Sequence, residues 1–406
     1  MNLKTTSFNK TPLILAMMII ATGQVGVSIY LPSLPLMSES LGVDSTQIQL
    51  VVTLFLIGFG GSQLFYGPLS DAIGRRPVFL LGQSVYLFGT VLCFIFTDSY
   101  TALITGRLLQ GLGAGSASVL SRSVLRDSYD GPNLTKALSY MSVTASILPI
   151  IAPVFGGWIA HHLGWQSVFS FVLVYLIAIF TIGWRVLPET LPYSPSKFEP
   201  RRIVGIYIKL LGNWQVIQSA SYNWVTYLGA VVTLSLLPFL MQKQLGMSAA
   251  DYGTIMLIPS FSLLIGTVCL NLMRKRLSQM QILFLSMLII SASGLGLLLA
   301  EFNTATLVIA FSGYAFAQGI SFPISIAMLL APHKKQVGSV SALSGSVQMI
   351  LAGAAGGFLI EHWVSDQQSL GYYYLVSAIV MAAMSLVVPL KKRLKRTGLI
   401  LSGDEN

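Results

Sequence analysis

The chain has 406 residues, of which 54% are apolar and only 9% are Asp, Glu, Lys or Arg. A soluble globular protein carries about 25% charged residues, so this chain has too few charged residues to cover a water-exposed surface. Its mean hydropathy of +0.74 indicates a lipid environment instead. The formal charge of +10 could indicate nucleic-acid binding, but the basic residues gather in loops on one side of the predicted spans. The composition therefore excludes most enzymes, and we expect no nucleic-acid partner.

Twelve apolar runs are each long enough to cross about 30 Å of hydrocarbon, which takes about 20 helical residues. In chain order they occupy residues 12–34, 47–69, 77–97, 101–122, 139–160, 165–187, 216–240, 252–273, 280–300, 305–330, 338–360 and 371–390. We predict an all-α membrane protein with two six-helix bundles, residues 1–187 and 216–390. A proline-rich cytoplasmic linker at 188–215 joins them, and a basic tail follows at 391–406.

Basic residues predict the orientation of the chain. With the N-terminus in the cytoplasm, every Lys and Arg except Lys243 and Arg107 lies on the cytoplasmic side or at a cytoplasmic helix end. This agrees with the positive-inside rule, and an even number of spans returns the C-terminus to the same side. Short loops and the lack of a targeting extension favour a bacterial inner membrane.

Two pairs of similar segments indicate duplicated halves. LGVDSTQIQL from Leu41 is similar to LGMSAADYGT from Leu245, and Gly156-Gly157 in the fifth span matches Gly356-Gly357 in the eleventh. Duplicated halves are typical of transporters that expose one site to the two sides of the membrane in turn. Such a protein would be complete as a monomer.

The loop between the second and third spans reads GPLSDAIGRRPVF, from Gly67 to residue 79. Gly67 and Gly74 permit close helix approach and a sharp turn. Asp71 lies at the membrane boundary, where a carboxylate needs a hydrogen-bond donor or a helix N-terminus. Arg75 and Arg76 would hold the loop at the anionic inner surface. An ordinary basic turn is the alternative interpretation.

Arg107 is the one charge well inside a span. It lies six residues, roughly 9 Å, below the outer boundary. Its burial costs about 2.5–3.5 kcal/mol on insertion scales, so we expect it to face the bundle interior and to have a polar partner. Gln110, three residues later, shares its helix face. The alternative is a structural arginine bound to backbone carbonyls or reaching outward.

The 67–79 string resembles the loop signature of the major facilitator superfamily, Gly-x-Leu-x-Asp-Arg-x-Gly-Arg-[Arg/Lys], and departs from it at Ala72. ITGRLLQGLGAG from Ile104 resembles the fourth-span motif Arg-x-x-Gln-Gly-x-Gly. GVSIYLPSLP from Gly26 resembles the first-span motif of drug exporters. With GWQSVF before the sixth span and LPET after it, the chain resembles the drug:proton antiporter branch, near the Bcr/CflA and EmrD-type exporters.

The fifth span resembles the end of the antiporter motif through Pro153, Gly156 and Gly157, which we expect to be helix-packing residues. Leu148 and Ala152 replace two expected glycines there, so the match is partial.

The resemblance implies the twelve-helix major facilitator fold and export of small hydrophobic or cationic drugs in exchange for protons by alternating access. It implies that Arg107 and Gln110 couple proton movement to transport. It also implies that Asp71, Arg75 and Asp127 belong to a gate at the inner side, together with the loop residues Gly67, Gly74 and Arg76.

Drug exporters of this kind often hold an acid in the first span, and this chain has none. All 14 acidic residues map to loops or helix ends, and the first span offers Gln24, whose amide does not titrate near neutral pH. The proton-binding group therefore stays open among Asp71, Asp127, Glu39 and Asp44.

A substrate cavity needs apolar walls with a few polar groups. Aromatic and amide side chains in spans expected to face the centre are candidates, although lipid contact or helix packing explains each one equally well. They are Gln24, Tyr30, Tyr227, Tyr314, Gln318 and Gln348.

Two other functions stay open, a dedicated exporter of one metabolite or antibiotic and a membrane sensor that does not transport. A dedicated carrier should have more charged groups in its spans, and a sensor usually has a cytoplasmic signalling domain. No His, Cys, Asp or Glu cluster with metal-ligand spacing occurs in the spans, so we expect no metal, no cofactor and no enzyme activity.

Overall fold

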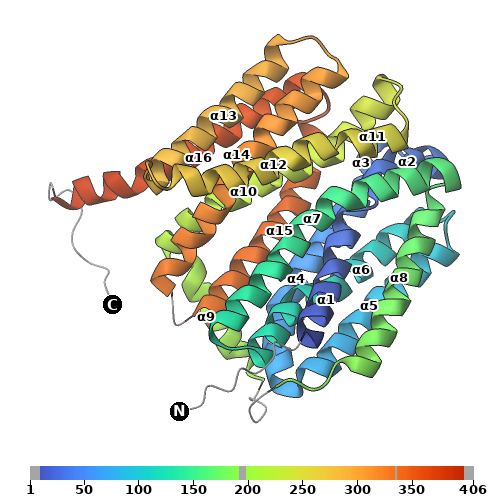
Figure 1. The fold of residues 1–406 in the computed structure, drawn as a ribbon. Coiled ribbons are helices and arrows are strands. Elements are labelled where there is room, and N and C mark those ends of the chain that lie inside the picture. Colours follow the sequence, from blue (N-terminus) through green and yellow to red (C-terminus); the bar gives the residue numbers. More distant parts are fainter. Residues whose placement is uncertain (1–9, 192–197, 334–335, 397–406) are drawn as a thin grey trace.

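The computed structural model describes residues 10–191, 198–333 and 336–396, with side chains as far as residue 386. Within these ranges the chain forms helices and short helical turns and no strand (Figure 1). Eleven helical segments there are long and apolar enough to cross a membrane. The 29-residue helix α6 (Tyr100–Ser128) is rich in glycine and serine and completes a set of twelve.

The first half of the chain forms one group of helices. These are α1 (Thr11–Ser28), α2 (Leu34–Leu41), α3 (Ser45–Ile48), α4 (Leu50–Ile73), α5 (Arg75–Ile95), α6, α7 (Gly131–Leu163) and α8 (Gln166–Val186). The second half forms the other group after a linker helix, α9 (Pro200–Leu211). These are α10 (Trp214–Pro238), α11 (Ala249–Ile255), α12 (Leu257–Met273), α13 (Gln279–Leu299), α14 (Thr304–Leu330), α15 (Val337–His362) and α16 (Gln367–Arg396).

Three elements differ from the apolar runs. The first span breaks after α1 into a 3-10 turn, Leu31–Ser33, and continues as α2, because prolines within it restrict the backbone and remove amide donors. Helix α7 begins at Gly131 rather than residue 139, since its first two turns are polar. The linker contains α9, whose one apolar face is too short to register as a span.

Helix starts follow local chemistry. Asp44 and Gln47 form a capping box at α3, in which the Asp44 carboxylate accepts from the Gln47 amide at 2.6 Å. Ser278 and Gln281 form the same motif at α13, and Asn303 caps α14. Each cap satisfies a backbone donor that would otherwise have no partner.

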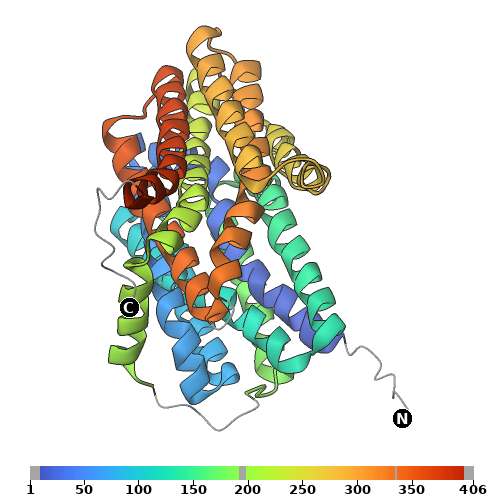
Figure 2. The same cartoon turned by 90° about the vertical axis from the view of Figure 1, so that its left-hand side faces the viewer.

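The two halves lie side by side, and α15 of the second half runs next to α4 of the first (Figures 1 and 2). We call the end of the molecule that holds α2, α3 and α11 the α11 end. The opposite end holds α9, the α4–α5 turn at Gly74 and the α6–α7 turn at Asp130, and we call it the α9 end.

Small residues let the halves approach closely. The Ser346 hydroxyl on α15 donates to the Gly60 carbonyl on α4 at 2.6 Å, and a Cβ on Gly353 would lie 2.8 Å from the Thr53 carbonyl oxygen. Close backbone approach through small side chains is how helices pack in membranes. The contact extends along much of both helices.

A second contact joins α7 to α11. A Cβ on Gly157 would meet the Ala249 carbonyl oxygen, and one on Gly253 would lie 2.5 Å from the Pro153 carbonyl oxygen. Gly156 faces inward in the first half, where a Cβ would meet the Ile29 carbonyl oxygen. The fifth-span Pro-Gly-Gly segment therefore lies against both the break in the first span and the second half.

In addition to the Ser346 bond, three side-chain bonds join the halves at the α11 end. They are Gln49 Nε2 to the Ser235 carbonyl at 2.8 Å, Gln242 Nε2 to the Pro32 carbonyl at 2.9 Å, and Lys243 Nζ to Glu39 Oε1 at 3.7 Å. Gln49 is buried, and its amide donates across the interface without exposure to water. The halves are thus fastened to one another at this end.

Candidate functional site

Arg107 lies inside the first half, on α6, with 1% of its surface exposed. Helix α6 packs against α1, α4 and α5, and its glycines make this possible. A Cβ on Gly111 would meet the Phe55 carbonyl oxygen, and one on Gly113 would lie 2.5 Å from the Gly82 carbonyl oxygen. The glycine-rich stretch that follows Arg107 therefore makes α6 the centre of this bundle.

The Arg107 guanidinium donates to three helices. Its bonds run from Nε to the Val51 carbonyl at 3.0 Å, from Nη1 to Gln110 Oε1 at 2.8 Å and from Nη2 to the Gly26 carbonyl at 3.1 Å. Gln110 in turn donates from Nε2 to Thr90 Oγ1 on α5 at 2.9 Å. One connected network thus joins α1, α4, α5 and α6.

Two aromatic rings enclose the same guanidinium. The Arg107 Cζ lies 4.5 Å from the ring centre of Tyr30 and 4.2 Å from that of Phe55. Ring faces attract a cation most strongly where water is excluded. In the part of the chain that the structure describes, no carboxylate pairs with Arg107. Carbonyl dipoles and ring faces therefore balance the charge.

Tyr30 is part of this interior and not of a cavity wall in this conformation. Only 1% of its surface is exposed, its ring lies 4.5 Å from that of Phe169, and its buried hydroxyl has no hydrogen-bond partner among the described residues. The assignment of Tyr30 to a substrate cavity stays a prediction. Gln24 lies on α1, about one turn before that helix ends, and is partly buried.

A charged cluster lies at the α9 end. Arg75 donates from Nε to Asp127 Oδ2 at 2.9 Å, and from Nη1 to Ser70 Oγ at 2.7 Å and to Asp71 Oδ1 at 2.5 Å. These residues come from the end of α4, the start of α5 and the end of α6. The structure brings together the predicted gate residues Asp71, Arg75 and Asp127, all within the first half.

Glu189, which follows α8, completes this cluster. Its carboxylate accepts from the backbone amides of Arg75 at 2.8 Å, of Arg76 at 3.2 Å and of Leu191 at 3.0 Å. The amides at a helix N-terminus attract negative charge, so Glu189 holds the start of α5. The sequence interpretation did not assign it a role, and its signal was the LPET string at 187–190.

Gly67 and Gly74 differ in what they contribute here. Gly74 has φ +104°, and a Cβ on it would meet the Glu189 carboxylate, so this turn requires glycine. Gly67 has only one ordinary contact, 3.7 Å to Val119. Arg76 donates from Nη2 to the Trp184 carbonyl at 2.7 Å, which ties the loop to α8.

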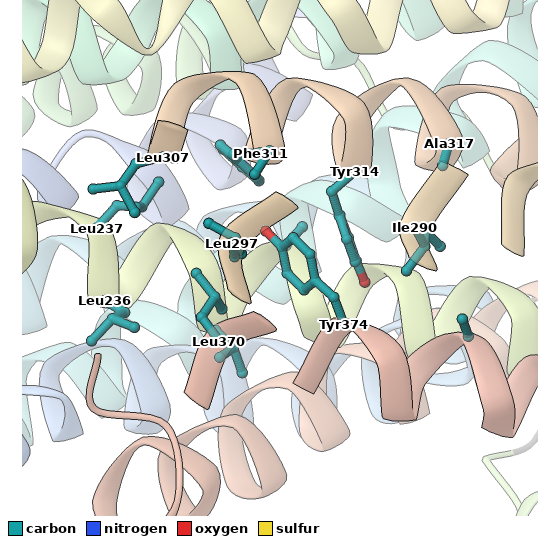
Figure 3. Packing of buried hydrophobic residues seen from close by; sticks show 14 of the residues in the cluster. Leu236, Leu237, Ile290, Leu297, Leu307, Phe311, Tyr314, Ala317, Leu370 and Tyr374 are labelled. Atoms are coloured by element: carbon teal, nitrogen blue, oxygen red, sulfur yellow. The ribbon is translucent and has the colours of Figure 1, made fainter. Parts of the chain in front are cut away.

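Tyr314 lies in the core of the second half. Figure 3 shows its ring on α14 beside that of Tyr374 from α16, with the ring centres 4.4 Å apart. Its hydroxyl donates to the Thr226 carbonyl at 3.1 Å, and none of its surface is exposed. Tyr314 is thus enclosed in the core of the second half, and its assignment to a substrate cavity stays a prediction.

The other second-half candidates lie nearer the first half. Tyr227 is partly buried and packs against a core cluster formed mostly by the first half. Gln348 on α15 accepts from Asn223 Nδ2 on α10 at 2.7 Å. Gln318 is buried on α14. Among the described residues no group of three His, Cys, Asp or Glu side chains could hold a metal ion.

The fold and this set of contacts define a polytopic helical membrane protein built from two halves. The family model described as Major Facilitator Superfamily matches residues 14–357. The chain belongs to this superfamily, whose members are transporters rather than enzymes, and the predicted fold class is confirmed.

Relatives cover nearly the whole chain. Multidrug resistance protein D of Escherichia coli (strain K12) is 27% identical over 400 residues, which are 96% of this chain and 98% of that protein. Multidrug resistance protein MdtL of Shigella flexneri serotype 5b is 26% identical over 370 residues, 88% of each chain. The crystal structure of the human organic anion transporter MFSD10 (TETRAN) matches with a TM-score of 0.65 at 16% identity, over 92% of this chain and 99% of that one. This last match supports the fold alone.

Proposed function

We propose that the chain exports small hydrophobic drugs in exchange for protons, by exposing one site between its halves to each side of the membrane in turn. Two relatives named multidrug resistance proteins, aligned over 88% or more of the chain, support drug export. The observation that carries the proposal is that three of the side-chain bonds between the halves lie together at one end, the α11 end. Such bonds can be exchanged for others at the opposite end as the halves rock.

The α9 end is the cytoplasmic side in this proposal. It carries Arg75, Arg76, Arg126 and the basic residues of α9, whereas Lys243 is at the α11 end. The positive-inside rule then puts both termini in the cytoplasm and makes this conformation the one closed to the outside. A bacterial inner membrane agrees with the source of both relatives.

Arg107 and Gln110 would link proton movement to the motion of α1. Their network ties α1 to α4 and α5 through the Gly26 and Val51 carbonyls, close to the point where α1 ends and the 3-10 turn begins. A shift of the guanidinium would therefore change the course of the first span. Because Arg107 keeps its proton, a carboxylate must bind the transported one, and Asp71, Asp127, Glu39 and Asp44 are the candidates.

The substrate class follows from what the middle of the spans offers. Within the described helices, the acidic residues lie at the helix ends, so a cationic drug would depend on aromatic faces alone. We therefore assign hydrophobic molecules as the main class. Gln24, Tyr227, Gln318 and Gln348 are the polar groups that would orient them.

The test uses energised inside-out vesicles that contain the protein. A pH gradient is imposed, hydrophobic drugs are added singly, and proton release is followed with a pH-sensitive dye. We expect drug-induced proton release by the wild type and none by Arg107→Ala. The control is Arg274→Ala, which changes an exposed arginine and should release protons as the wild type does. Full release by a folded Arg107→Ala variant would remove this residue from the mechanism. No release from a broad drug panel would contradict proton-coupled drug export.

A further inference from the structure

Two arginines on α6 have no role in the sites above. Arg122 and Arg126 are one helical turn apart, so they lie on one face of the helix, and both side chains are exposed. Ser121 and Ser123, which flank Arg122, are buried. A single basic face of α6 is therefore open toward the α9 end, although the rest of the helix is enclosed by its own bundle.

This basic face of α6 looks toward α15 of the second half. The position of a Cβ on Gly338, at the start of α15, is 3.9 Å from Arg126 Nη1. Ser118, one helical turn before Arg122 on α6, donates to Gln63 Oε1 at 3.3 Å. Gln63 Oε1 in turn lies 3.5 Å from the position of a Cβ on Gly345. Helices α6 and α15 run in opposite directions, so Arg122 lies between these two levels, in the space between the halves.

Among the described residues, the two guanidinium groups have no paired counter-charge. In the ranges that the structure describes, neither forms an ion pair or a hydrogen bond with another side chain or with the backbone. Like charges four residues apart on a helix repel one another. Of the nearby carboxylates, Asp127 pairs with Arg75 and Glu189 accepts from backbone amides. Asp130, just beyond the end of α6, forms no ion pair with either arginine.

The surroundings of these arginines add further positive charge. Helix α15 begins beside Arg126, and its N-terminus has no side-chain cap, so its amides present partial positive charge to the same space. The Arg122 side chain is exposed where α6 faces α15. Protein of low dielectric on both sides of an accessible cation strengthens its attraction for anions.

We propose that Arg122 and Arg126 bind the anionic head group of amphiphilic substrates, such as an aryl sulfonate or a hydrophobic carboxylate, at the cytoplasmic opening between the halves. The inference deepens the proposed export function, because it depends on substrates entering between the halves from the α9 end. Paired arginines suit such a head group since planar guanidinium forks bind carboxylate and sulfonate oxygens in pairs. The apolar body of the molecule would then lie further in, near Ser118 and Gln63.

The experiment compares two dyes that share an apolar ring system. Anilinonaphthalene sulfonate carries an anionic group, and phenylnaphthylamine is its neutral analogue. Binding to the full-length protein in phosphatidylcholine nanodiscs is measured by energy transfer from tryptophan, with empty nanodiscs as the blank. The variants are Arg122→Gln and Arg122→Lys. The control is Arg276→Gln, which removes an exposed charge at the same end of the second half.

We expect Arg122→Gln to weaken sulfonate binding by about tenfold, which is the loss of one charge-assisted contact, and to leave the neutral dye unchanged. Arg122→Lys should retain part of the preference, and Arg276→Gln all of it. Equal losses for both dyes, or the same loss in Arg276→Gln, would overturn the proposal.

A second arm separates substrate from lipid. Phosphatidylglycerol is added to the nanodiscs, and its head group should not displace the sulfonate. Displacement in the wild type that is absent in Arg122→Gln would overturn the assignment to substrates, because a lipid head group would then occupy the site.

The proposed function can fail separately. Arg122-dependent sulfonate binding without any drug-induced proton release in vesicles would contradict proton-coupled export and leave the anion site standing. Proton release induced by neutral drugs would support proton-coupled export. If Arg122→Gln then weakened binding of neither dye more than the other, the anion site alone would be contradicted.

Discussion

At the scale of single residues, the molecule depends on how a buried positive charge is held without a carboxylate. Arg107 donates to two helix carbonyls and one amide oxygen, and lies between the rings of Tyr30 and Phe55. The planar guanidinium can do this because its donors diverge in a fixed fork, whereas a lysine ammonium is a compact point charge. The shape of the cation therefore matters here as well as its charge.

Arg107→Lys should consequently fail as a conservative replacement. The ammonium keeps the charge but cannot reach the Gly26 and Val51 carbonyls together. We expect the free energy of unfolding to fall by about 1.5–3 kcal/mol, the contribution of a charged hydrogen bond, and drug-induced proton release to be lost. Thermal unfolding in detergent and vesicle assays measure the two effects, with Arg274→Lys as control. A variant with wild-type stability would mean that the network is dispensable.

Gly74 provides a second test at this scale. Its φ of +104° is disfavoured for other residues, and a Cβ would meet the Glu189 carboxylate. Gly74→Ala should destabilise the protein by about 1–3 kcal/mol, whereas Gly205→Ala, where a Cβ meets nothing within 4 Å, should not. The measurement is the shift of the thermal unfolding midpoint of each variant. Equal shifts would show that the turn tolerates side chains.

At the residue scale, the sequence predicted correctly those contacts that follow from the spacing of residues on one face of a helix. Arg107 and Gln110 are three positions apart, and their contact follows from helix geometry. The sequence did not predict that Tyr30 and Tyr314 are fully enclosed, because an aromatic side chain in an apolar span can face the bundle core, the lipid or a cavity, and only the packing of neighbouring helices decides which. Glu189 was missed because the LPET string marks its position but does not show that its partners are the backbone amides of Arg75 and Arg76.

At the scale of elements, the contact between α4 and α15 holds the halves together. Ser346 donates to the Gly60 carbonyl, and Gly353 and Gly357 both face Thr53. None of these positions has room for a larger side chain, so the two backbones approach without intervening bulk. An interface of this kind slides or separates as a unit, which suits a rocking motion.

Gly353→Leu should separate these helices at the α11 end. A Cβ there would lie 2.8 Å from the Thr53 carbonyl and 3.0 Å from Leu56 Cβ, and overpacking of this kind costs about 1–3 kcal/mol. A cysteine introduced by Leu56→Cys, in a background without Cys93 and Cys269, should then react faster with an impermeant maleimide added from the α11 side. The matched control is Gly296→Leu, where a Cβ meets nothing within 4 Å. An unchanged rate would contradict a close-packed interface.

The sequence predicted the spans but not their irregularities. Apolar runs locate helices because lipid requires about 20 apolar residues for each crossing. The polar start of α7 and the amphipathic helix α9 lie outside such runs, so hydropathy cannot find them. The π-helical turn Phe239–Gln244, which follows α10, depends on contacts with the other half, since Gln242 donates to the Pro32 carbonyl there.

At the scale of the whole molecule, the main features are the duplicated halves and the three side-chain bonds that join them at the α11 end. The repeated segments predicted two bundles, and the helices of the structure form one group before the linker helix α9 and another after it. What the sequence could not give is the conformation, because the bonds of Gln49, Gln242 and Lys243 join residues about 200 positions apart. These bonds distinguish a state closed at the α11 end from a state closed at the α9 end.

The most direct test of the central claim is a pair of distances between spin labels in the reconstituted protein. One pair, Ser45→Cys with Trp363→Cys, reports on the α11 end, and the other, Asn133→Cys with Asn271→Cys, reports on the α9 end. The native Cys93 and Cys269 are replaced by serine.

A bound drug together with a changed pH should lengthen the first distance and shorten the second, and Arg107→Ala should abolish this reciprocal change. If both distances stay fixed, or change in the same direction, while the protein transports drug, then the halves do not rock about a central site and the account is contradicted.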